Sequence, residues 1–313
     1  MLSISSLNVY APHDNVTTKD GCATDEMECV VLKLIRKAGL AMAMAGALAT
    51  VAATAPSQAA GTRPVPSGTE VIVQDVRVPV PGQRPVQAYL VRPAGTLRPH
   101  SQAGILFLHW LGQIHSDRTE FLAEAIGLAS EGAVSLLPQG TFPYDVNPVG
   151  TRHDVTAVKE QLGVFRASLN WLIARAYVSR SRIAVVGHDY GAMYGALLAN
   201  SDPRVHAAVL ATPDATWGHW FVKYWLGFTG NRAARYDALF AGLQPADHVS
   251  RLGKRELFQW AGKDIFVSAS VRRQFARQAP QARVDFYPAA DHQLTSTAQA
   301  DRDAFLRREL GLS

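Results

Sequence analysis

Cysteine is scarce in this chain of 313 residues, which contains only Cys22 and Cys29. Both precede a segment that we expect to be removed, so the mature protein would have no disulfide, no thiolate nucleophile and no cysteine metal site. The sequence also lacks the H-E-x-x-H zinc motif, a phosphate-binding loop and the glycine fingerprint of dinucleotide-binding proteins. It therefore implies neither a metal nor a cofactor.

Charge of one sign is not concentrated anywhere in the predicted mature chain. The net charge is +5, from 31 Lys and Arg against 26 Asp and Glu, and the arginines are scattered. A nucleic-acid partner would require a basic stripe interleaved with aromatic residues, and none occurs. We expect a small-molecule substrate instead, and the oligomeric state is not indicated.

The N-terminal region has the three parts of a secretory signal peptide. A basic segment, Leu32–Lys37, precedes the apolar and alanine-rich Ala38–Ala55, and a small-x-small site follows at Ser57–Ala59. The alternative is a membrane anchor, but the apolar stretch is borderline in length for one. We expect residues 1–59 to be a leader and signal peptide cleaved after Ala59. The protein would then be secreted or periplasmic, with no stable membrane anchor.

Residues 60–313 predict a single domain in which strands and helices alternate. This order is typical of an α/β fold with a mostly parallel sheet covered on both faces. The predicted strands are 70–80, 86–93, 103–110, 133–140, 182–188, 205–212, 257–262 and 283–289. The predicted helices are 117–132, one capped by Asp154 and running to about 172, one from Gly191, and then 269–279 and 297–310.

Ionisable residues follow three of the predicted strands of this sheet. Asp189 follows the strand 182–188, Asp264 comes just after 257–262, and His292 comes just after 283–289. In open α/β sheets the functional site lies beyond the carboxyl ends of the strands. We therefore expect these three side chains to form one site.

The residues around Asp189 carry a family resemblance. Gly187-His188-Asp189-Tyr190-Gly191 resembles the G-x-nucleophile-x-G elbow of the α/β-hydrolase superfamily. The aspartate is similar to that of epoxide hydrolases and haloalkane dehalogenases, while the compact layout resembles the dienelactone hydrolase-related branch. That branch ordinarily uses Cys or Ser as nucleophile, so Asp189 departs from it. The resemblance implies an α/β-hydrolase fold with a small aromatic cap at about 214–250.

An aspartate nucleophile narrows the chemistry. Its attack on an ester carbonyl gives a reactive anhydride, whereas its attack on an sp³ carbon gives an ordinary ester. We therefore expect a covalent aspartyl ester formed from a small apolar substrate, more readily from an epoxide than from a haloalkane. His292, oriented by Asp264, would activate water to hydrolyse this ester. Backbone N–H groups of Tyr190 and of Trp110 or Leu111 would form the oxyanion hole.

Aromatic residues concentrate in the predicted cap and are candidates for substrate contacts. The candidates are Trp110, Trp217, Trp220, Tyr224, Trp225 and Tyr236. Aromatic clusters are often plain core, and Asp189 alone could be a helix N-cap. Asp291, next to His292, is a rival to Asp264 for the acid role.

Two other functions remain open at this point. One is an esterase or dienelactone-type hydrolase in which Asp189 acts as a base toward water. The other is a hydrolase-fold binding protein without catalysis, whose aromatic cap holds a ligand. An incomplete triad would favour the binding protein, and this triad is complete in sequence.

Overall fold

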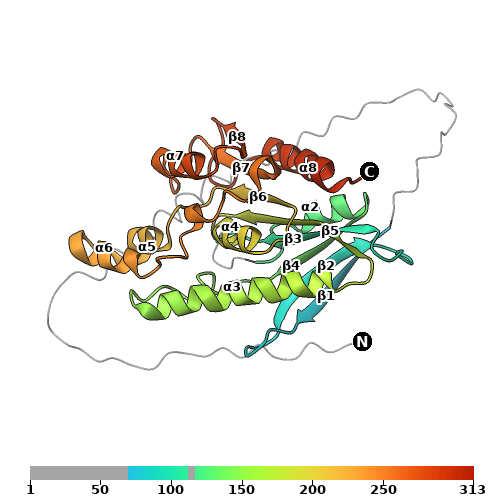
Figure 1. The fold of residues 1–313 in the computed structure, drawn as a ribbon, viewed down its shortest axis with the longest axis horizontal. Coiled ribbons are helices and arrows are strands. Elements are labelled where there is room, and N and C mark those ends of the chain that lie inside the picture. The colour runs from blue at the N-terminus through green and yellow to red at the C-terminus, as the bar shows by residue number, and fades with distance from the viewer. Residues whose placement is uncertain (1–69, 112–116) are drawn as a thin grey trace, which may run out of the picture. The chain divides into compact units, whose positions relative to one another are not determined.

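The computed structural model describes residues 70–111 and 117–313, shown as a ribbon in Figure 1. The predicted signal peptide, its cleavage site and both cysteines lie outside these residues. Within the described ranges, no helix has both the length and the hydropathy that a membrane span requires.

The described residues form an eight-stranded sheet in the order β1-β2-β4-β3-β5-β6-β7-β8. The strands are β1 (Val71–Val78), β2 (Val86–Pro93), β3 (Gln102–Leu108), β4 (Ala133–Pro138), β5 (Val178–His188), β6 (Ala207–Ala211), β7 (Glu256–Ala261) and β8 (Arg283–Tyr287). β1 and β2 pair antiparallel as the predicted hairpin, and β2 pairs antiparallel with β4. All remaining pairs are parallel. The carboxyl ends of β3 to β8 therefore meet at one edge.

Helices cover both faces of the sheet, as predicted (Figure 1). The principal helices are α2 (Leu122–Ala129), α3 (Arg152–Ile173), α4 (Tyr190–Ser201), α7 (Ala269–Gln278) and α8 (Ser296–Leu310). Apolar side chains of α3, α4 and α7 belong to one core cluster, and those of α2 and α8 belong to a second. Strands between the two clusters are buried on both sides, which explains the continuous apolar runs of β3 and β4.

The start of α3 differs from the expectation. Thr151, rather than Asp154, is the N-cap, and its hydroxyl accepts a hydrogen bond from the His153 N–H at 3.2 Å. Asp154 lies three residues inside and completes a capping box. The pattern of apolar residues located the helix correctly but not its first turn, because both Thr and Asp are good cap residues.

The cap between β6 and β7 is built mainly from short helical segments. It contains α5 (Trp217–Phe221), a π-helical turn η2 (Val222–Leu226) and α6 (Gly230–Ala238), followed by the 3₁₀ turns η3 (Pro245–Asp247) and η4 (Gly253–Arg255). The cap therefore begins at the carboxyl end of β6, beside the end of β5, because these strands pair in parallel.

Candidate active site

Asp189 occupies a sharp turn between β5 and α4. Its φ of 52° and ψ of −118° lie outside the regions that non-glycine residues favour. The turn brings backbones together: a Cβ on Gly187 would lie 2.3 Å from the Gly191 carbonyl oxygen, and a Cβ on Gly191 would lie 2.0 Å from that of Leu108. Glycine at both positions is therefore required for this geometry, as in a nucleophile elbow.

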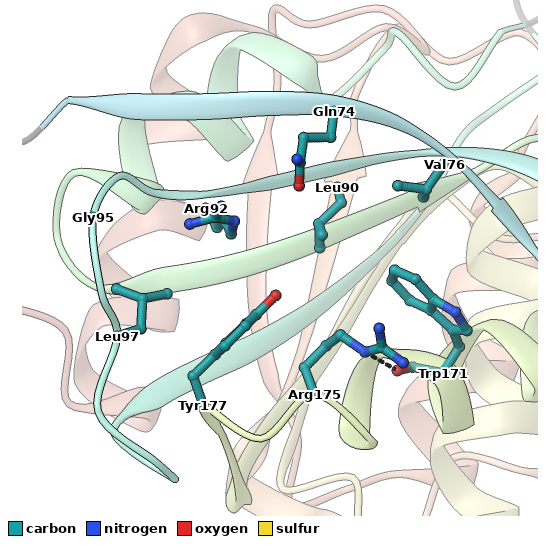
Figure 2. A pocket seen from close by; sticks show the side chains of 9 residues that line it. All are labelled: Gln74, Val76, Leu90, Arg92, Gly95, Leu97, Trp171, Arg175 and Tyr177. Atoms are coloured by element: carbon teal, nitrogen blue, oxygen red, sulfur yellow. Dashed lines mark hydrogen bonds between the residues drawn. The ribbon is translucent and has the colours of Figure 1, made fainter.

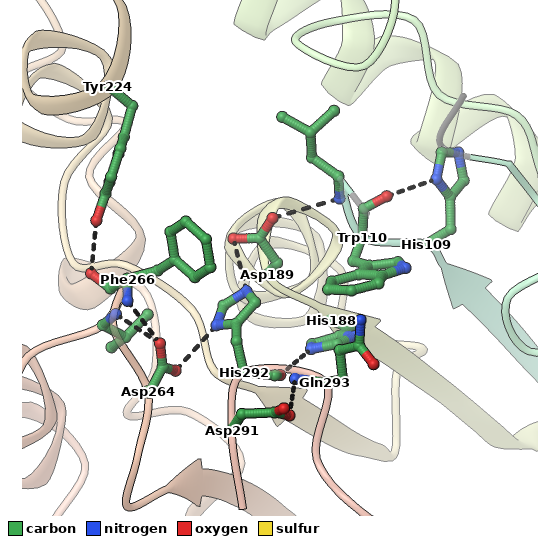
Figure 3. Close-up of polar contacts among 12 residues, drawn as sticks. His109, Trp110, His188, Asp189, Tyr224, Asp264, Phe266, Asp291, His292 and Gln293 are labelled. Atoms are coloured by element: carbon green, nitrogen blue, oxygen red, sulfur yellow. Dashed lines mark hydrogen bonds and ion pairs between the residues drawn. The ribbon is translucent and has the colours of Figure 1, made fainter. Parts of the chain in front are cut away.

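The structure brings the three predicted ionisable residues together (Figure 3). His292 Nε2 lies 3.5 Å from Asp189 Oδ1, and His292 Nδ1 lies 2.9 Å from Asp264 Oδ2. The other oxygen of Asp264 accepts hydrogen bonds from the N–H groups of Phe266 at 2.8 Å and Val267 at 2.9 Å. These bonds fix Asp264, which in turn fixes the imidazole. Asp291 does not compete, because its carboxylate accepts the Gln293 N–H.

The two carboxylates determine the charge of His292. Burial alone would lower the pKa of the imidazole, but the interactions with Asp189 and Asp264 outweigh it and raise the pKa to about 10. Burial would raise the pKa of Asp264, yet its bond to His292 lowers the pKa overall. At neutral pH the site therefore holds an imidazolium between two carboxylates.

Only one of the two predicted loop donors faces Asp189. The Leu111 N–H donates to Asp189 Oδ2 at 3.3 Å, whereas the Trp110 N–H donates to Glu120 Oε2 at 2.6 Å. Tyr190 is the first residue of α4, so its N–H has no acceptor within the helix. The available oxyanion donors are thus the N–H groups of Leu111 and Tyr190.

Glu120 is the site residue that sequence reasoning missed. Its second oxygen, Oε1, lies 2.6 Å from His188 Nδ1, and His188 Nε2 lies 2.9 Å from the His292 carbonyl oxygen. The Trp110 ring stacks on His188 with centroids 4.9 Å apart. Glu120 precedes α2 within an ordinary helical pattern, so no sequence signal distinguished it.

Most cap aromatics are tied to the surrounding structure through their polar atoms. Four of them donate hydrogen bonds: Trp217 to the Leu243 carbonyl, Tyr224 to the Phe266 carbonyl, Trp225 to Asn147 and Tyr236 to Asp154. Tyr236 therefore anchors the cap to α3. The ring of Phe266 lies 5.0 Å from that of His292 and links the triad to the rings of Trp220 and Tyr224.

A surface hollow lies apart from this site. It has a volume of about 390 Å³ and is lined by side chains of β1, β2, the end of α3 and the segment after it, including Arg92, Trp171 and Arg175 (Figure 2). None of the residues predicted for catalysis lines it. Within 70–111 and 117–313, no three His, Cys, Asp or Glu side chains are grouped so that they could hold a metal ion.

Comparisons with known proteins decide the family. Residues 87–307 match the model of the dienelactone hydrolase family. The chain belongs to the dienelactone hydrolase family. This membership makes it a hydrolase, and the fold described above is the α/β-hydrolase fold that was predicted.

Solved structures share this fold at low sequence identity. An acetyl xylan esterase from Paenibacillus sp. R4 superposes with a TM-score of 0.64 at 17% identity, covering 80% of this chain and 87% of that one. A putative dienelactone hydrolase from Klebsiella pneumoniae gives 0.53 at 16% identity, covering 77% and 99%. An esterase from Pyrococcus furiosus gives 0.54 at 17% identity, covering 82% and 97%. A search of curated proteins gives no match.

These relatives favour the esterase alternative over the epoxide hydrolase prediction. The family name and the two esterases point to ester or lactone hydrolysis, and none of these three matches is an epoxide hydrolase. The residue at the turn after β5 is nevertheless an aspartate, Asp189.

Proposed function

We propose that this member of the dienelactone hydrolase family cleaves carboxylic esters or lactones, with Asp189, His292 and Asp264 as catalytic residues. The observation that carries the proposal is the position of the His292 imidazole between the carboxyl groups of Asp189 and Asp264. Such a pair offers a base and a proton donor side by side in a buried site.

Asp189 and His292 can divide the proton transfers of ester hydrolysis. Asp189 Oδ1 takes a proton from water as the water oxygen bonds to the substrate carbonyl carbon. His292 Nε2 then donates its proton to the departing alkoxide, and the proton on Asp189 returns to His292. Because the pKa of His292 is raised to about 10, the ring is protonated and ready to donate at neutral pH.

A covalent aspartyl route is the second candidate, and one contact favours it. The Leu111 N–H already holds Asp189 Oδ2, the oxygen on which negative charge would develop when water attacks an aspartyl ester. Oδ1 would attack an sp³ carbon, such as that of an epoxide, and His292 Nε2 would give its proton to the epoxide oxygen as the C–O bond breaks. Forming the ester removes the Asp189 charge, which lowers the pKa of His292, so that the now neutral ring can take a proton from water in the second step.

A single turnover in ¹⁸O-water separates the two routes. Water activation places the label in the product acid and leaves Asp189 unlabelled. The covalent route places one ¹⁸O in the Asp189 carboxyl group, which mass spectrometry of the peptide containing residue 189 detects. The panel should contain aryl and alkyl esters, a lactone and an epoxide.

The variant His292→Gln provides a second measurement. On the covalent route it cannot activate water and should retain an added substrate mass, whereas on the water route the protein mass stays unchanged. Wild-type protein that turns over no member of the panel would contradict both routes. That result would leave the hydrolase-fold binding protein as the remaining reading.

A further inference from the structure

Four buried polar atoms next to Asp189, at the start of α4, after β6 and in the cap, have no hydrogen-bond partner among the residues that the structure describes. They are Tyr190 Oη, Thr212 Oγ1, Asp214 Oδ2 and Trp220 Nε1. None of these residues is more than 3% exposed. Leaving a buried polar group unpaired is costly, so such a concentration in one place points to a ligand that would complete the bonds.

The fold places these groups around the elbow. β5 and β6 pair with His188 opposite Ala211, so Thr212 follows β6 beside Asp189, and the Asp189 N–H donates to the Ala211 carbonyl at 2.9 Å. The ring of Tyr190 meets that of Trp220 edge to face at 5.6 Å.

Thr212 is held in a conformation that costs energy. Its φ of 46° is rare for a β-branched side chain, and the residue is fully buried. Backbone strain of this kind persists where the surrounding structure enforces it, and it is concentrated at functional sites. Here the strained residue is the neighbour of Asp189 across the sheet.

Asp214 is fixed so that one oxygen remains available. Its Oδ1 accepts the Thr216 N–H at 3.2 Å and lies 3.7 Å from His219 Nδ1, while Oδ2 is buried without a partner in the described part of the chain. Burial, with the negative charges of Asp189 and Asp214, raises the pKa of Tyr190 well above its usual value. The phenol therefore stays protonated and acts as a donor.

The cluster thus combines donors with an acceptor. Trp220 Nε1 can only donate, Tyr190 stays protonated, and a carboxylate oxygen of Asp214 can only accept. A carbonyl group on a ligand could accept from the rings but could not donate to Asp214. An ammonium group could donate to Asp214 but could not accept. A hydroxyl group does both.

We infer that this cluster binds a hydroxyl group of the substrate, so that the enzyme acts on esters that carry hydroxyl groups near the scissile bond. The inference rests on the proposed ester hydrolysis and replaces the small apolar substrate expected from the sequence. Asp214 accepts the substrate O–H, Tyr190 and Trp220 donate to the same oxygen, and Asp189 lies next to them. A site built in this way discriminates against analogues that lack the hydroxyl, because its own polar groups then stay unpaired.

Binding of a matched pair of unreactive amides tests the inference independently of turnover. The probes are the acetamide of aminopropanediol, which carries two hydroxyl groups, and N-propylacetamide, which carries none. Titrations followed by tryptophan fluorescence should show the diol binding about tenfold or more tightly to wild type. Asp214→Asn keeps the acceptor that holds Thr216 but replaces Oδ2 by a donor, and Tyr190→Phe removes the hydroxyl. Each variant should lose most of the preference for the diol.

The control is Asp247→Asn, which removes the same charge from an exposed position of η3. It should bind both probes as wild type does. Equal affinity of wild type for both amides, or an undiminished preference in Asp214→Asn, would overturn the inference. If no ester is hydrolysed but the diol preference depends on Asp214, the proposed function fails while the hydroxyl-binding site stands.

Discussion

Glu120 joins the two loops that flank Asp189, because one of its oxygens lies 2.6 Å from His188 Nδ1 while the other accepts the Trp110 N–H. The opposite nitrogen of His188 contacts the His292 carbonyl. A single carboxylate thus connects the loop after β3, the turn after β5 and, through His188, the loop after β8. In the proposed reaction Glu120 would act as a positioning residue.

Replacing Glu120 by glutamine should reduce kcat while KM changes little. Glutamine has a single side-chain oxygen, so it can keep only one of the two contacts that the carboxylate makes with Trp110 and His188, and the loops separate. Misplacement by about 1 Å costs about 100-fold in rate. The control is Glu131→Gln, which breaks an ion pair with Arg307 away from the site and should leave kcat unchanged. A Glu120→Gln enzyme with wild-type kcat would show that the connection is not used.

Two aspartates near His292, Asp264 and Asp291, are the candidates for the residue that orients its ring, and substitutions can distinguish them. Asp264→Asn removes a charge that raises the pKa of His292, so the ring should lose its proton at lower pH and its fixed orientation. We expect kcat to fall about 10⁴-fold, as when the acid of a comparable triad is replaced by its amide. Asp291→Asn is the matched control, since that side chain contacts only the Gln293 N–H among the described residues. If Asp291→Asn lost activity and Asp264→Asn kept it, Asp291 would be the residue that orients His292.

Stability should decline in alkaline solution because of His292. The pKa of this ring is raised from its ordinary value of 6.5 to about 10, so protonation stabilises the folded state. This contribution is complete below about pH 6.5 and is lost progressively as the pH rises to about 10. The Tm of wild type should therefore fall more steeply over that range than the Tm of His292→Gln. Parallel curves for the two proteins would mean that the ring is neutral in the folded state.

The sequence was sufficient for the sheet and for the sharp turn at Asp189, because both have strong local signals. Buried strands such as β3 are continuous apolar runs, and Gly187 and Gly191 mark a turn that no larger residue permits. The positions of Asp264 and His292 just after β7 and β8 also predicted that they lie near Asp189, because parallel strands end at one edge of the sheet.

Other features depend on contacts between distant segments. Glu120 reaches the site from 68 residues before His188, and no local pattern records that approach. The role of each cap aromatic residue likewise could not be predicted from the sequence. Tyr236 bonds to Asp154 in α3, whereas the ring nitrogen of Trp220, beside Tyr190, has no hydrogen-bond partner within 70–111 and 117–313. Sequence pattern marks a side chain as aromatic, but tertiary packing decides which of its atoms remain available.

The two elbow glycines should be far less tolerant than a third glycine in α4. An alanine at Gly191 would bring its Cβ within 2.0 Å of the Leu108 carbonyl oxygen, which is backbone and cannot rotate away. At Gly195 the nearest atom is a Leu210 methyl group at 3.1 Å, which can move. Urea denaturation should show a loss of about 3 kcal/mol or more for Gly191→Ala and about 1 kcal/mol for Gly195→Ala. Similar losses in both would contradict the close backbone contact.

Removing the Tyr190 hydroxyl should stabilise the free protein while it weakens substrate binding. The oxygen is buried without a partner among the described residues, so its desolvation is not compensated until a ligand binds. Phenylalanine keeps the ring contacts with Trp217 and Trp220. We expect Tyr190→Phe to raise the free energy of unfolding by about 1 kcal/mol in urea titrations. Tyr194→Phe is the opposite control, because its hydroxyl donates to the Phe142 carbonyl at 2.9 Å and its loss should destabilise the fold. A destabilised Tyr190→Phe would mean that the hydroxyl is already satisfied in the free enzyme, and the gain in stability would then give no support to a ligand-completed cluster.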